Sequence, residues 1–115
     1  MKIVRTGIPG PPVVARVALA ASALLTLAAA EADEGSSLAR QHACTTCHAM
    51  DAKLVGPSFK AIAQKYKADA TAADKLAAGM LKGSQGKWGP IPMPPVAGLT
   101  DQDAKALAQW IMSLP

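Results

Sequence analysis

The sequence predicts an all-α domain of four to five short helices, and three observations support this fold class. Apolar residues recur at helical spacing in three stretches of the chain. No stretch shows the alternation of apolar and polar residues that is typical of a half-buried strand. The third observation is the run Cys44-Thr45-Thr46-Cys47-His48, which offers two thiols and an imidazole to one group around which short helices can pack.

The first two helices flank this run. Ser36 and Ser37 are candidate N-caps for a short helix over residues 38–43. Residues 51–55 are expected to form a loop, after which Gly56-Pro57 turns the chain. A second helix is predicted over residues 58–67, because its apolar residues share one face. These residues are Phe59, Ile62 and Tyr66.

Two further helices are predicted in the C-terminal half. One covers about residues 71–82 and ends at Gly83, a glycine just beyond the C-cap. The last helix starts after Thr100, which with Asp103 resembles a capping box, and runs to about Ser113. The apolar face of the earlier helix carries Leu76, Ala77, Met80 and Leu81. The buried stripe of the last helix is predicted to be Ala104, Leu107, Ala108, Ile111 and Leu114, with Trp110 beside it.

The spacing Cys-x-x-Cys-His is the attachment signature of c-type haem. Cys44 and Cys47 can each add across one vinyl group of the porphyrin, and His48 then reaches the iron from the same side. A thioredoxin-like dithiol would need a βαβ context, which the chain lacks. A structural zinc site would need four ligands, and these three residues with His42 are too crowded to close a tetrahedron. The motif therefore predicts one covalently bound haem with His48 as a ligand.

The second iron ligand is predicted to be Met93. It lies in the segment Trp88-Gly89-Pro90-Ile91-Pro92-Met93-Pro94-Pro95, whose four prolines fix φ and lack N–H donors. Such a segment is stiff and can hold a thioether in place. The alternative is that Met93 fills a gap in the core, as most methionines do. Met50 and Met80 lie in or near apolar helical stretches and Met112 lies on the last helix, so Met93 alone has a rigid loop position.

These residues resemble the small bacterial class I cytochromes c that carry electrons to nitrite reductase and terminal oxidases. The resemblance covers about residues 33–115 and includes Leu54-Val55-Gly56-Pro57 and Gly83-Ser84-Gln85-Gly86. It implies a cytochrome c fold wrapped around one haem c. It also implies that the Pro57 carbonyl accepts the hydrogen bond of the proximal imidazole. Trp88 would donate its indole N–H to a haem propionate, or would only form a wall of the pocket.

Residues 1–32 are predicted to be a cleaved signal peptide, and residues 33–115 the cytochrome c domain. Basic residues precede an apolar run over residues 17–30, and Ala30-Glu31-Ala32 offers a cleavage pattern, with cleavage after Ala32 or Ala30. The run is shorter than the roughly 20 residues that span a bilayer. Cleavage after Ala32 lowers the net charge from +4 to +2, because 9 Lys and Arg and 7 Asp and Glu then remain. The charge therefore gives no reason to expect nucleic-acid binding.

Other polar side chains have a functional and an ordinary interpretation. His42 is expected at the surface, because it lies beside Cys44 on the attachment side. Six lysines either ring an exposed haem edge and steer an acidic partner or form an ordinary solvated surface. These are Lys53, Lys60, Lys65, Lys67, Lys82 and Lys87.

We therefore expect a periplasmic electron carrier, not an enzyme, whose iron cycles between ferrous and ferric with His48 and Met93 bound. The expected partners are a respiratory reductase upstream and a nitrite reductase or terminal oxidase downstream. No nucleic acid and no stable membrane insertion after cleavage are expected, and the protein should be a monomer. The alternative is a haem peroxidase or gas-binding sensor with an open distal site, although no distal His or Arg pair can be named. A subunit of a larger enzyme complex is a third possibility.

Overall fold

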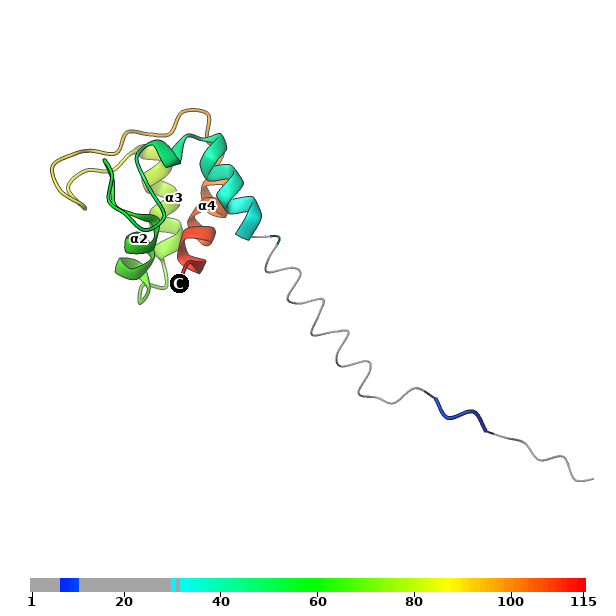
Figure 1. Ribbon diagram of the computed structural model, residues 1–115. Coiled ribbons are helices and arrows are strands. Elements are labelled where there is room, and N and C mark those ends of the chain that lie inside the picture. Colours follow the sequence, from blue (N-terminus) through cyan, green and yellow to red (C-terminus); the bar gives the residue numbers. More distant parts are fainter. Residues whose placement is uncertain (1–6, 11–29, 31) are drawn as a thin grey trace, which may run out of the picture.

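The computed structural model describes residues 7–10, 30 and 32–115. Of these, residues 32–115 form a helical domain with no β-sheet. The elements are a first helix over residues 32–41, the 3₁₀ turn η1 (Cys44–Thr46), α2 (Phe59–Tyr66), α3 (Ala72–Lys82) and α4 (Asp101–Ser113). The first helix, α2 and α3 lie around α4 (Figure 1). The all-α prediction is confirmed. The predicted leader lies almost wholly outside the described residues, and none of the described helices has the length and apolar character needed to cross a membrane.

The first helix differs from its prediction, because it covers residues 32–41 instead of 38–43. Ser36 and Ser37 lie inside it and do not cap its start. Ser36 Oγ donates to the carbonyl of Asp33 at 3.2 Å. A serine in a helix can satisfy its hydroxyl in this way, so a Ser-Ser pair does not by itself mark a helix start.

Side-chain and glycine caps set the ends of α2 and α3. Ser58 Oγ accepts a hydrogen bond from the N–H of Ala61 at 3.1 Å, which makes Ser58 the N-cap of α2. Gly83 ends α3 with φ 80°, a conformation that glycine adopts without strain. Both helices lie where they were predicted. The two ends of α2 and the start of α3 each differ from the prediction by one residue.

The helix α4 begins where predicted, but its cap is only half of a capping box. Thr100 Oγ1 accepts from the N–H of Asp103 at 3.1 Å. The carboxylate of Asp103 lies 3.6 Å from Nε2 of His42, at the end of the first helix. Asp103 therefore links two helices, and the side chain of His42 is only 17% exposed instead of lying free at the surface.

The core is built on α4. Its buried residues are Ala104, Leu107, Ala108, Trp110 and Ile111, so the predicted stripe is confirmed except that Leu114 is only partly buried. Phe59 of α2 meets Trp110 edge-on, with ring centroids 5.0 Å apart. A Cβ atom at Gly35 would lie 2.1 Å from Cγ of Trp110. The first helix can therefore cross α4 closely only because residue 35 is glycine.

Candidate haem site

The segment 43–48 folds into one tight turn that brings its reactive groups together. Ala43 takes a left-handed conformation, φ 56°, which ends the first helix and starts η1. The N–H groups of Cys47 and His48 both donate to the carbonyl of Cys44, at 3.2 and 3.0 Å. Residues three apart lie on the same side of such a turn. Cys44, Cys47 and His48 accordingly line one cavity.

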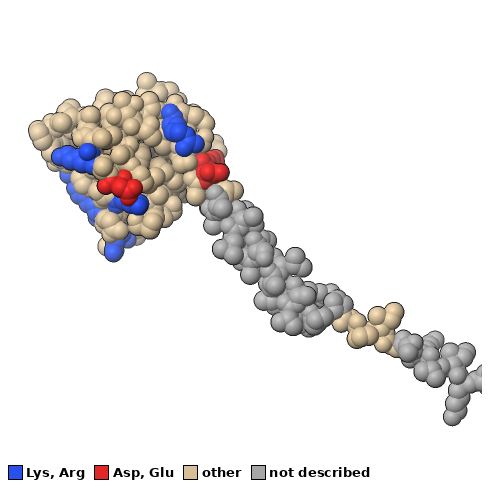
Figure 2. Space-filling model, viewed as in Figure 1, with Lys and Arg blue, Asp and Glu red and all other residues tan. Residues whose placement is uncertain are grey.

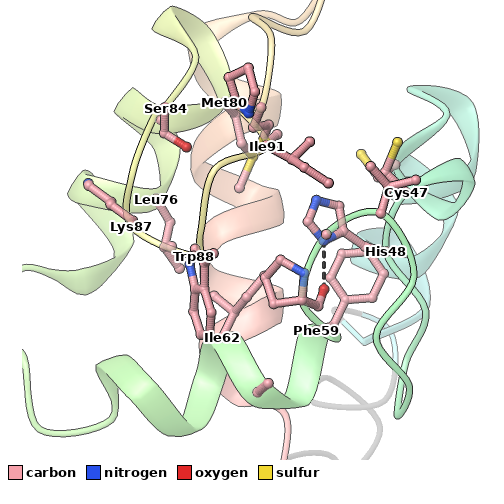
Figure 3. A pocket seen from close by; sticks show the side chains of 18 of the residues that line it. Cys47, His48, Phe59, Ile62, Leu76, Met80, Ser84, Lys87, Trp88 and Ile91 are labelled. Carbon is pink, nitrogen blue, oxygen red and sulfur yellow. Dashed lines mark hydrogen bonds between the residues drawn. The ribbon is translucent and has the colours of Figure 1, made fainter.

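The imidazole of His48 is held in a fixed orientation. It is 9% exposed, and its Nδ1 lies 2.7 Å from the carbonyl oxygen of Pro57 (Figure 3). With Nδ1 as the donor, Nε2 keeps its lone pair and is free to bind a metal. The ring of Phe59 lies beside it, with centroids 5.5 Å apart. A histidine so arranged is suited to be an axial ligand of iron.

Gly56 makes room for this imidazole. A Cβ atom at residue 56 would lie 2.5 Å from Cε1 and 2.9 Å from Nδ1 of His48, closer than real Cβ contacts. The N–H of Gly56 donates to the carbonyl of Cys47 at 2.9 Å, which folds the loop back over the motif. The sequence indicated only a turn at Gly56-Pro57, because no local pattern shows that a ring from residue 48 packs there.

A cavity of about 370 Å³ opens beside His48, within the range of roughly 300–1,000 Å³ typical of ligand and cofactor pockets. Figure 3 shows Cys47 and His48 on one side of it and Leu76, Lys87 and Trp88 on the other. Apolar side chains form most of the wall. They are Val55, Pro57, Phe59, Ile62, Tyr66, Leu76, Met80, Trp88, Pro90, Ile91, Pro92, Met93, Pro94, Leu107 and Ile111. Such a wall suits a flat apolar group that carries a metal.

Met93 lines this cavity from a segment whose ends are paired. The N–H of Ser84 donates to the carbonyl of Met93 at 3.0 Å, and the N–H of Met93 donates to the carbonyl of Ser84 at 2.9 Å. Met93 is partly buried. Met80 of α3 also lines the cavity and is 8% exposed, so the structure adds a second thioether that the helical pattern had assigned to the core.

The Cys44 thiol is partly buried, and this affects its pKa. Burial raises the pKa of the Cys44 thiol, and the neighbouring Cys47 adds to the increase, while a backbone hydrogen bond opposes it. Nucleophilic and metal-binding cysteines instead have lowered pKa values. Within the described residues, no three His, Cys, Asp or Glu side chains form a group that could hold a metal ion.

The remaining predicted site residues lie around the mouth of the cavity. Trp88 lines it and remains 38% exposed. Lys53 and Lys87 also line it, whereas Lys60 pairs with Asp51. Figure 2 shows basic side chains spread over the visible face together with acidic ones, without a region of one sign only.

Comparison with known proteins identifies the group that such a site serves. The family model "Cytochrome c" matches residues 32–115. The chain belongs to the cytochrome c family. Cytochrome c-552 of Nitrosomonas europaea is 50% identical over 95 residues, which are 83% of this chain and 90% of that protein. Cytochrome c-551 of Pseudomonas aeruginosa is 42% identical, over 86% of this chain and 94% of the relative. The crystal structure of the Nitrosomonas protein has a TM-score of 0.68 at 48% identity, and covers 70% of this chain and 99% of that one.

The residues present fit the cofactor of this family. The attachment motif, the oriented His48 and the apolar cavity lie together, as one covalent haem c requires. The protein therefore carries one haem c and is a small electron carrier that acts with protein partners, not an enzyme.

Proposed function

We propose that this cytochrome is a periplasmic carrier whose haem iron alternates between ferrous and ferric while bound by His48 and Met93. The observation that carries the proposal is the orientation of His48, whose Nδ1 is engaged by the Pro57 carbonyl at 2.7 Å. This contact directs Nε2 to the metal and makes the imidazole a stronger donor. Residues 33–115 would be the mature domain, and residues 1–32 a leader cleaved after Ala32 or Ala30.

Met93 is favoured over Met80 as the second ligand. The N–H and the carbonyl of Met93 are both hydrogen-bonded to Ser84, and prolines flank Met93. Its thioether therefore belongs to a stiff segment. Met80 instead belongs to the buried cluster and its carbonyl accepts from the N–H of Val96 at 2.9 Å, which ties the proline segment to α3. Met80 thus serves the packing of the segment that carries Met93.

The bound haem supplies one-electron transfer between its two iron states. The protein residues set how easily that electron is taken up. A thioether ligand and an apolar pocket favour the ferrous state and raise the reduction potential. We expect Trp88, which lines the cavity and is partly exposed, to hold a haem propionate with its indole N–H.

Partners would dock at the mouth of the cavity. Val55 and Ile91 line the cavity, as do Lys53 and Lys87. Val55 and Ile91 are 53% and 62% exposed, and Leu54 beside Val55 is 50% exposed. A small patch of this kind supports weak and short-lived encounters, as a carrier that serves two partners needs. We propose a respiratory reductase as the electron donor, a nitrite reductase or terminal oxidase as the acceptor, and a monomeric carrier.

Two methionine variants test the ligand set. In the ferric protein, Met93→Ala should abolish the methionine–iron charge-transfer band and let added imidazole bind, because alanine cannot reach the iron. Met80→Ala is the matched control, since it removes the other thioether of the cavity and should keep the band. If Met80→Ala loses the band and Met93→Ala retains it, the assignment is wrong. Haem staining after denaturing electrophoresis checks the covalent attachment, which acid–acetone extraction should not reverse.

A further inference from the structure

A single lysine connects α2 to the segment that faces it across the mouth of the cavity. The ammonium of Lys65 donates to the carbonyl of Lys87 at 2.8 Å, across 22 residues of sequence. The same ammonium lies 4.2 Å from the centroid of the Trp88 ring, well inside the range of a cation–π contact. Trp88 lines the cavity and is partly exposed, so this contact lies at the edge of the cavity.

The segment 85–92 has little else to hold it. All of its residues are exposed, and its ends are closed by the Ser84–Met93 pair. Among the hydrogen bonds of the described part of the chain, the bond from Lys65 is the one that joins residues 85–92 to the rest of the domain. Gly86 and Gly89 within the segment have φ values of 74° and 114° and no atom near their Cβ positions, so the backbone there is open.

The helix α2 joins the two sides of the cavity. Its N-cap Ser58 directly follows Pro57, whose carbonyl holds the imidazole of His48. Lys65 lies in its last turn, about 10 Å further along the axis at 1.5 Å per residue. One rigid helix therefore carries the contact that orients the proximal histidine and the contact that holds the opposite loop.

We propose that Lys65 is a positioning residue that holds Trp88 and the segment 85–92 closed over the haem edge. It acts through the Lys87 carbonyl and the Trp88 ring. By limiting the opening of the segment it also limits the dissociation of Met93 from ferric iron, a step that rests on the proposed ligation. Its role therefore differs from that of a lysine that only contributes surface charge.

Three variants of the haem-loaded protein test this role. Lys65→Met removes the donor and the charge, Lys65→Arg keeps both, and Lys67→Met removes an equal charge from the same end of α2 without these contacts. Amide exchange measured by NMR at Ser84 and Met93, whose N–H groups donate to each other's carbonyls at the ends of the segment, should become about ten-fold faster in Lys65→Met, because a charged hydrogen bond and an exposed cation–π contact are lost. It should change little in the other two variants.

A second measurement links the loop to the iron. The alkaline pH at which ferric iron loses methionine should fall by about one unit in Lys65→Met, which corresponds to the same ten-fold shift. Equal behaviour of Lys65→Met and Lys67→Met would overturn the proposal. So would acceleration of α4 amides as large as that at Ser84 and Met93, because Lys65 would then act on global stability. The exchange measurement does not depend on which methionine binds iron, so it remains decisive if the ligand assignment fails.

Discussion

Single residues decide how close the chain comes to the groups that bind the cofactor. Gly56 lies against the ring of His48, and Gly35 lies against Trp110. No local sequence pattern reveals these contacts. Gly35 and Trp110, for example, lie near opposite ends of the domain in sequence. The spacing of Cys44, Cys47 and His48 predicted that these residues hold the haem. It did not identify the glycines that leave room for them, because their role depends on tertiary contacts.

Gly56→Ala should impair the proximal side of the site. The new methyl group would overlap the His48 ring, and forcing a group into a packed site costs about 1–3 kcal/mol. We expect a lower thermal midpoint of the haem-loaded protein and a changed ferric spectrum as the imidazole is displaced. Differential scanning calorimetry and absorption measure both effects. An unchanged midpoint together with an unchanged spectrum would show that the loop around residue 56 can move away from His48 without a cost in stability.

At the scale of elements, periodicity predicted the helices well where apolar faces were regular. The ends of α4 and the end of α3 at Gly83 were predicted correctly, because Thr100 and Gly83 act through local backbone chemistry. The start of the first helix was not predicted correctly, because the hydroxyl of Ser36 donates a hydrogen bond within the helix and does not cap its start. The pairing of Ser84 with Met93 also had no sequence signal, because isolated bridges lack the alternation of a strand.

The interior of α3 offers a stabilising change. Gly79 lies in this helix without a positive φ, and a Cβ atom there would meet only Cβ of Ser84, at 3.9 Å. Gly79→Ala should therefore raise the free energy of unfolding by about 0.5–1 kcal/mol, because alanine loses less backbone entropy on folding. The reverse change at the exposed Ala78, Ala78→Gly, should lower it by a similar amount. Chemical denaturation of the haem-loaded variants measures both, and a destabilised Gly79→Ala would mean that the cavity wall needs the glycine.

The start of α3 should make stability depend on acid pH. The hydrogen bond from Lys75 lowers the pKa of Asp69 to about 2, with further bonds from the hydroxyl and N–H of Thr71. Because this pKa is lower in the folded state, Asp69 contributes stability above about pH 4 that is lost as the pH falls toward 2. Asp69→Asn should lower stability at pH 7 and flatten its dependence between these values. A dependence in Asp69→Asn equal to that of the unmodified protein would contradict this role.

At the scale of the whole molecule, α4 holds the domain together and the haem cavity takes the place of much of its core. Leu107 is the largest fully buried side chain of the described residues, and it also lines the cavity. The walls of the cavity come from η1, the loop 53–57, α2, α3, α4 and the segment 84–94. These parts of the chain therefore all contact the cofactor. The sequence predicted this arrangement only through the attachment motif, because the helical stripes alone do not tell which of them face a cofactor.

Folding should therefore depend on haem attachment. A domain of this size gains only about 3–5 kcal/mol from an unaided core, and here a large apolar surface faces the cofactor. The mature Cys44→Ala/Cys47→Ala protein, prepared without haem, should lose more than half of its helical circular dichroism at 25 °C. The haem-attached protein is the control and should unfold in one cooperative transition. Retention of the full helical signal with a cooperative thermal transition in the variant would show that α4 and its neighbours suffice, and that the haem adds function without being needed for the fold.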